Sequence, residues 1–211
     1  MAVRVPAIAV GLAACAVLAG CSTTTGGTAT GTSTASSPPA DTASNSTTTK
    51  HGAPRVTTPV DYATTEANPC GALTAAQVTA LGLGSLQGRD NSSAAAKACL
   101  WADESGPSGL SIGEGFVVGG GGLDGVYLLR SSYRLFEPQA PVQGQPALLI
   151  DLADNRSRGE CGLAVGLTDT MHMLVTVQSR TGSNPAPRIG EPCAVAREVA
   201  DAMLTTIKKG S

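Results

Sequence analysis

The sequence predicts an α+β fold: a small antiparallel sheet of about five strands, with helices packed on one face and two disulfides. Three observations predict it. Apolar residues alternate with polar or small residues over several short runs, and apolar residues recur at helical spacing near the C-terminus. Four cysteines lie in the region that carries both patterns. The expected order is helix, two strands, helix, three strands, helix.

The first helix is expected to begin after Thr74, because Thr74 and Gln77 have the spacing of a capping box. The glycines at 82 and 84 should end it. Two strands follow. In the second of them, Leu110, Ile112 and Phe116 alternate with small residues. We expect these strands at residues 98–103 and 110–118.

The second helix is predicted after Asp124, a plausible N-cap, with Val126, Leu129 and Tyr133 at helical spacing. Prolines at 138 and 141 should end it. Alternating apolar residues then predict three more strands. These strands are expected at residues 147–151, 161–167 and 171–177.

The last helix has the clearest pattern. Pro192 suits a first turn, and Lys208 and Lys209 suit the negative end of the helix dipole. An apolar stripe at steps of three and four residues should face the sheet. The stripe consists of Cys193, Ala196, Ala200, Met203 and Ile207.

The N-terminus has the features of a lipoprotein signal peptide. A short basic region with Arg4 precedes an apolar run that is too short to span a bilayer comfortably. The run ends in Leu18-Ala19-Gly20-Cys21, which matches a lipobox. We therefore expect residues 1–20 to be removed and Cys21 to be lipidated, which places the protein on the outer face of the cell membrane.

Residues 21–66 are predicted to form a disordered tether that begins at the lipidated cysteine. Between residues 22 and 50, 17 of 29 side chains are Ser or Thr. Such a segment cannot bury enough apolar surface to order itself. The tether acts as a spacer in one interpretation and as an O-glycosylated stalk in another. The remaining residues, 67–211, make one domain.

The four domain cysteines predict two disulfides, because their number is even and the predicted compartment is oxidising. Three pairings are possible, and we favour the one in which each disulfide closes a loop of roughly 30 residues. A metal site is disfavoured, since no CxxC or HxxxH spacing accompanies these cysteines. The favoured pairs are Cys70 with Cys99 and Cys161 with Cys193.

The domain residues resemble the actinobacterial lipoprotein family called domain of unknown function 3558. The resemblance rests on Asn68-Pro69-Cys70, Cys99-Leu100-Trp101 and Cys161-Gly162-Leu163, with Pro192-Cys193 opening the last helix. It covers about residues 69–207. The family also implies a lipobox and a Thr/Ser-rich tether, but it implies no activity and no catalytic residues.

Three motifs suggest chemistry, and each has a structural alternative. Gly109-Leu110-Ser111-Ile112-Gly113 matches the elbow of serine hydrolases, with Asp151 and His172 following in triad order, yet Ser111 falls inside a predicted strand. The glycines of residues 120–125 match a dinucleotide motif without its βαβ unit. We expect the first motif to be part of a strand and the second to be a turn. We expect His172 to pack on the solvent-facing side of its strand.

The most consistent function is therefore a non-enzymatic binding or accessory module of the cell envelope. From residue 66 onward there are 11 basic and 14 acidic side chains, which gives no basic footprint for nucleic acid. The expected partners are the membrane, through the anchor at Cys21, and an envelope protein, lipid or glycan. No cofactor is expected. An esterase that uses Ser111 and a passive structural component are the alternatives.

Overall fold

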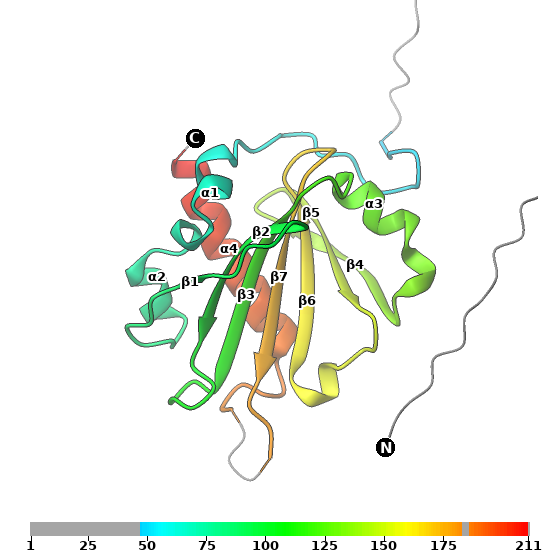
Figure 1. Cartoon of the computed structure of the whole chain (residues 1–211). Helices are drawn as coiled ribbons and strands as arrows, with labels where there is room; N and C mark the ends of the chain where they lie inside the picture. Colours follow the sequence, from blue (N-terminus) through cyan, green and yellow to red (C-terminus); the bar gives the residue numbers. More distant parts are fainter. Residues whose placement is uncertain (1–46, 183–185, 211) are drawn as a thin grey trace, which may run out of the picture. The chain divides into compact units, whose positions relative to one another are not determined.

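Figure 1 shows the computed structural model of the chain, in which residues 47–182 and 186–210 are described. The predicted signal peptide, Cys21 and most of the predicted tether lie outside these residues. The described residues belong to one compact unit.

The described unit is built on one antiparallel sheet of seven strands in the order β1-β2-β3-β7-β6-β5-β4. The last strand in the chain, β7, lies between β3 and β6 and joins two groups of strands that are each contiguous in sequence. The strands are β1 (Arg89–Asp90), β2 (Ala96–Ala102), β3 (Leu110–Val117), β4 (Leu135–Val142), β5 (Gln145–Asp151), β6 (Glu160–Gly166) and β7 (His172–Ser179).

Two of the seven strands were not predicted. β1 has only two residues, which is too short for a periodic pattern. β4 contains Pro138 and Pro141, which we expected only to end a helix. Proline is tolerated in an edge strand, and β4 is the last strand of the sheet, with a register shift between Gln139 and Val142. The edge position therefore explains why two prolines occur in a strand.

The helices are short except for the last. The capping box of Thr74 and Gln77 is present at the start of α2, and Pro192 lies in the first turn of α4, as predicted. The α-helices are α1 (Ala63–Ala67), α2 (Ala75–Ala80), α3 (Gly122–Leu128) and α4 (Pro192–Lys209). The 3-10 helices are η1 (Pro69–Ala72), η2 (Arg130–Ser132) and η3 (Arg156–Arg158).

Helices cover both faces of the sheet, so the prediction of one covered face is wrong. The larger core lies under α4, whose predicted stripe contributes four fully or almost fully buried side chains (Ala196, Ala200, Met203 and Ile207). On the other face, Leu123 and Val126 of α3 pack against Leu148, Ile150 and Ala164. Neighbouring residues of β5 are buried on opposite faces, which is why a second layer of helix is needed.

Two disulfides attach helices to the sheet. Cys70 of η1 is bonded to Cys99 of β2, and Cys161 of β6 is bonded to Cys193 at the start of α4. This is the pairing that we favoured from the sequence.

The folded unit begins earlier than predicted. Residues 47–66, which we assigned to the tether, pack on the domain. Ala53 and Val60 are buried, and the Val60 amide donates a hydrogen bond to the Leu167 carbonyl at 2.9 Å. The ring of Tyr62 stacks on Phe116 with centroids 6.0 Å apart. Few apolar side chains occur in this segment, so its composition resembles that of a linker although its contacts do not.

Candidate functional site

Charged side chains gather around a hollow at the end of the sheet where β6 begins and β7 ends. The hollow measures about 470 Å³, and its walls are mostly polar. We call it the polar hollow. Its lining consists of Glu104, Arg158, Glu160, Gln178, Ser179, Arg180 and Thr181. Two acidic and two basic side chains balance one another there.

Hydrogen bonds fix the charged walls of the polar hollow. Arg180 follows β7, and its Nη1 donates to the carbonyl oxygens of Glu104 at 2.7 Å and Gly106 at 3.0 Å. The carboxylate of Glu160 accepts from Asn155 Nδ2 at 2.9 Å, and Arg158 donates to Asn155 Oδ1. The side chains are thus held in place before any partner arrives, which lowers the entropy that binding would cost.

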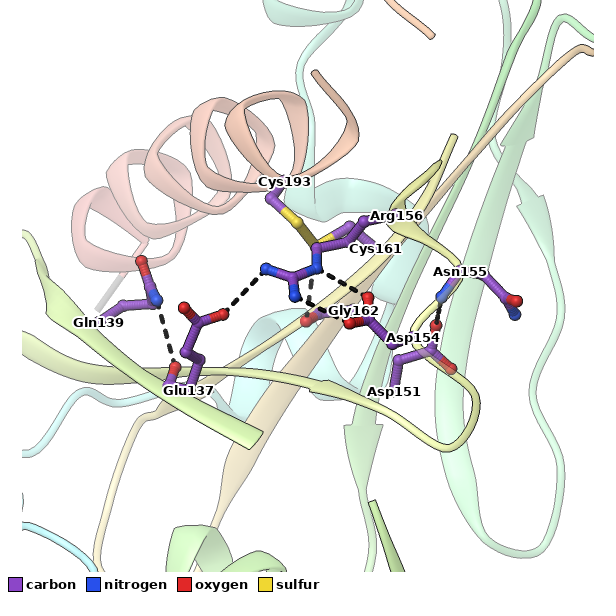
Figure 2. The surroundings of a disulfide bond; sticks show 9 residues. All are labelled: Glu137, Gln139, Asp151, Asp154, Asn155, Arg156, Cys161, Gly162 and Cys193. Atoms are coloured by element: carbon purple, nitrogen blue, oxygen red, sulfur yellow. Dashed lines mark hydrogen bonds and ion pairs between the residues drawn. A yellow bond between two sulfur atoms is a disulfide. The ribbon is translucent and has the colours of Figure 1, made fainter. Parts of the chain in front are cut away.

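A second hollow of about 440 Å³ lies beside the Cys161–Cys193 disulfide, between β4 and the start of α4. Figure 2 shows Arg156 in front of this disulfide, pointing toward Glu137 and Asp154. Its guanidinium donates to Glu137 at 3.0 Å and to Asp154 at 2.7 and 2.8 Å. The hydrogen bond from Arg156 lowers the pKa of Asp154. Both acids neutralise Arg156, so this hollow has no uncompensated cation among the described residues.

The two hollows flank the connection between β5 and β6. Arg156 lines one of them, and Arg158 lines the other. This connection contains the 3-10 helix η3, and the side chains of its two arginines line different hollows. The connection thereby becomes the shared wall of the two hollows.

One ionisable residue was missed by the sequence reading. Glu114 lies in β3 opposite Cys99 and Val175, on the face of the sheet that α4 covers. It is only 2 % exposed, and neither carboxyl oxygen has a hydrogen-bond partner among the described residues. Burial raises the pKa of Glu114 to about 8. The signal was present, because Glu114 occupies the apolar phase of the strand between Ile112 and Phe116.

His172 is buried, so the expectation that it faces solvent is wrong. It begins β7 and is 3 % exposed beneath the glycine turn that leads into α3. Burial lowers the pKa of His172 to about 4, although a hydrogen bond with the Gly122 backbone acts in the opposite direction. The imidazole is therefore neutral near pH 7.

The possible hydrolase triad does not come together. Ser111 pairs with Gln178 near the end of β7, whereas His172 is at its beginning. Six residues of strand separate those two positions, a distance of about 20 Å. Ser111 also lies within β3 and not in a strand-to-helix turn, as the strand interpretation predicted.

The glycines of residues 120–125 have a structural role. A side chain at Gly122 would approach the Asp169 carbonyl oxygen to 2.5 Å, and one at Gly125 would approach the Gly120 carbonyl oxygen to 1.8 Å. The motif thus lets the start of α3 pack closely on the turn between β6 and β7. Trp101, at 1 % exposure, is core, as its position beside a disulfide cysteine indicated.

Metal-ligating side chains do not gather in the described part of the chain: no three His, Cys, Asp or Glu residues there are arranged to hold an ion. Within the same residues, no helix is both long and apolar enough to cross a bilayer.

Comparison with known protein families gives one match. The model of a family described as "Protein of unknown function (DUF3558)" matches residues 16–206. This confirms the resemblance that the cysteine and Pro-Cys positions suggested. Comparisons with curated proteins and with solved structures found no match.

Proposed function

Because the chain belongs to the DUF3558 family, whose description assigns no activity, we propose its function from its own geometry. It is a lipid-anchored protein on the outer side of the cell membrane and serves as a non-enzymatic binding or accessory module of the envelope. Its binding surface is the polar hollow.

The observation that carries this proposal is the placement of the N-terminal segment relative to the polar hollow. Arg55 and the Val56 amide contact the carboxylate of Asp169 at 2.8 and 2.9 Å, and Asp169 lies in the turn after β6. The polar hollow lies at the opposite end, where β6 begins. A strand of the length of β6 spans roughly 20 Å. A chain that is held at Cys21 therefore reaches the domain at one end of β6. The polar hollow then stays accessible at the other end.

The chemistry of the polar hollow favours a polar partner. Its charges are of both signs and are held by hydrogen bonds, and its walls offer little apolar surface for an acyl chain. An envelope protein or a glycan fits such a surface better than a lipid tail does. The distance between Ser111 and His172 gives no support to the alternative of a serine esterase.

The anchor is tested by replacing Cys21 with alanine. We expect Cys21→Ala to leave the protein as an unprocessed precursor or to release it from the membrane fraction. The measurement is fractionation of cells combined with mass spectrometry of the N-terminal peptide. A wild-type chain without an acyl group at Cys21 would contradict the anchor.

The hollow is tested by photo-crosslinking in the native envelope. A photoreactive residue at Gln178, which is exposed in the polar hollow, should give a discrete adduct with a protein or a glycan. The same residue at Gln87, which is exposed in the connection between α2 and β1, serves as the matched control. Reversing a charge in the wall, with Glu160→Arg, should abolish the adduct at Gln178. Identical adducts at both positions, or none at Gln178, would contradict a binding role and favour a passive structural component.

A further inference from the structure

Two adjacent leucines are exposed at the end of α3. Among the described residues, Leu128 is 60 % exposed and Leu129 is 53 % exposed. Exposed leucines in isolation are common, but two in succession on a helix end form a small apolar surface. The neighbouring side chains indicate which kind of partner this surface would bind.

Aromatic contacts hold the residues on both sides of the two leucines in the chain. Tyr127 meets Phe136 of β4 edge to face, with ring centroids 5.0 Å apart, and Tyr133 lies 6.3 Å from the same ring. Arg130 is 5.0 Å above the Phe136 ring. The segment that carries the leucines is therefore attached to the sheet on both sides, through Tyr127 and Tyr133. Both tyrosines are partly exposed, with an apolar ring and a polar hydroxyl.

The charge beside the leucines is positive. Arg130 and Arg134 are exposed, and neither forms an ion pair with a carboxylate of the described residues. The nearest acid in the α3 sequence, Asp124, is already engaged by the side chains of Thr49 and His51. We call this surface the Leu128–Leu129 patch. It consists of Tyr127, Leu128, Leu129, Arg130, Tyr133 and Arg134.

The N-terminal segment packs beside α3, the helix that ends in this patch. The carboxylate of Asp124 accepts hydrogen bonds from the His51 amide at 2.7 Å and from His51 Nδ1 at 2.8 Å. Ala53 is buried with Leu123 and Val126 of α3. Figure 1 shows the first described residues, coloured blue to cyan, beside α3. The segment that leads toward Cys21 thus packs on the same helix that ends in the Leu128–Leu129 patch.

We propose that the Leu128–Leu129 patch docks on the anionic surface of the membrane. The inference rests on the proposed function, in which Cys21 is anchored in that membrane. The leucines would enter the boundary between headgroups and acyl chains, the tyrosines would lie at the interface, and the arginines would contact lipid phosphates. Docking adds a second contact to the anchor and fixes the orientation of the domain on the membrane.

The test uses the native, processed full chain reconstituted in lipid vesicles. An environment-sensitive fluorophore is attached to a cysteine at Ser131, which is next to the patch and leaves its six side chains intact. The control carries the fluorophore at Ser157. Both serines are exposed, and each lies in a three-residue 3-10 helix beside arginines. The vesicles contain phosphatidylcholine, either alone or with an equal amount of phosphatidylglycerol.

Docking predicts that the fluorophore at Ser131 shifts to shorter wavelength and loses access to an aqueous quencher on phosphatidylglycerol vesicles, whereas that at Ser157 changes in neither respect. Replacing Leu128 and Leu129 together with glutamine should abolish the shift. Arg130→Gln and Arg134→Gln should each lower the ratio of docked to free domain about fivefold.

Three results would overturn the proposal. The fluorophore at Ser131 could behave like the control, or its shift could be the same on vesicles of pure phosphatidylcholine. A shift that depends on protein density and not on lipid charge would instead assign the patch to a second copy or another protein. Failure of the anchor is seen separately, because an unlipidated chain does not float with vesicles of pure phosphatidylcholine.

Discussion

The buried carboxyl of Glu114 makes the stability of the protein depend on pH. Glu114 is 2 % exposed and has no hydrogen-bond partner among the described residues, and burial raises its pKa from 4.5 to about 8. Replacing it in Glu114→Gln preserves the shape of the side chain and removes the ionisation. The comparison of the two proteins therefore isolates the cost of charging this one group.

The sign of the effect follows from the protons bound by each state. Between pH 4.5 and 8 the folded protein keeps a proton on Glu114 and the unfolded chain does not, so the free energy of unfolding falls as pH rises. The slope is about 1.4 kcal/mol per pH unit. His172 acts in the opposite direction, because burial lowers its pKa from 6.5 to about 4 and stability rises with pH over that window. The two slopes cancel between pH 4.5 and 6.5.

The decline in the free energy of unfolding should therefore be visible between pH 6.5 and pH 8. In this range, Glu114 contributes to the pH dependence and His172 does not. Over this range the wild type should lose about 2 kcal/mol of unfolding free energy, whereas Glu114→Gln should lose almost none. Urea melts at both pH values, with the disulfides intact, measure the difference. Glu104→Gln, which alters an exposed carboxyl, should retain the wild-type slope.

Parallel declines in wild type and Glu114→Gln would refute the reasoning, because the slope would then belong to another group. A wild type without any decline would show that the Glu114 carboxylate is solvated in the fold.

Three further predictions concern the core, the buried histidine and the disulfides. Met203→Ala should cost about 2–5 kcal/mol in denaturant melts, and the exposed Lys209→Ala under about 0.5 kcal/mol; equal costs would mean that α4 is not core. In the same melts, His172→Gln should lose stability steadily from pH 4.5, where the wild type is flat up to pH 6.5. Alkylation of the denatured, unreduced domain should label none of its four cysteines, and labelled pairs would refute the disulfides.

Elements with strong local signals were predictable from the sequence. The capping box at Thr74 and the helix opened by Pro192 depend on residues within one or two turns, and both are present. The disulfide pairing was predictable because each bond closes a short loop between cysteines that are consecutive in the domain, with separations of 29 and 32 residues.

Features that depend on long-range packing were not predictable. The prolines of β4 are compatible with a strand only because β4 lies at an edge, and the strand order decides that position. Arg197 illustrates the same point on α4: it lies outside the predicted apolar stripe, yet its guanidinium donates to the carbonyl oxygens of Ala140 and Pro141 at 2.8 and 2.7 Å.

The candidate site was less predictable than the fold. Arg158 and Arg180 are far apart in the chain, and only the pairing of β6 with β7 brings them to one hollow. Glu114 was visible as a charge in the apolar phase of a strand, but its lack of a partner depends on every element packed around it.

The central position of β7 has a consequence for the order in which the protein folds. β2 and β3 form one local pair, and β4, β5 and β6 form a local meander. The two halves meet only through β7, which follows both of them in the chain. Contacts of such long sequence separation are slow to form, because closing the chain between them costs entropy first. Since β7 follows β6 through a short turn, we expect β7 to join the meander early, and the inner edge of β3 to stay unpaired until β7 docks against it. That interval is when the chain is most exposed to aggregation and proteolysis.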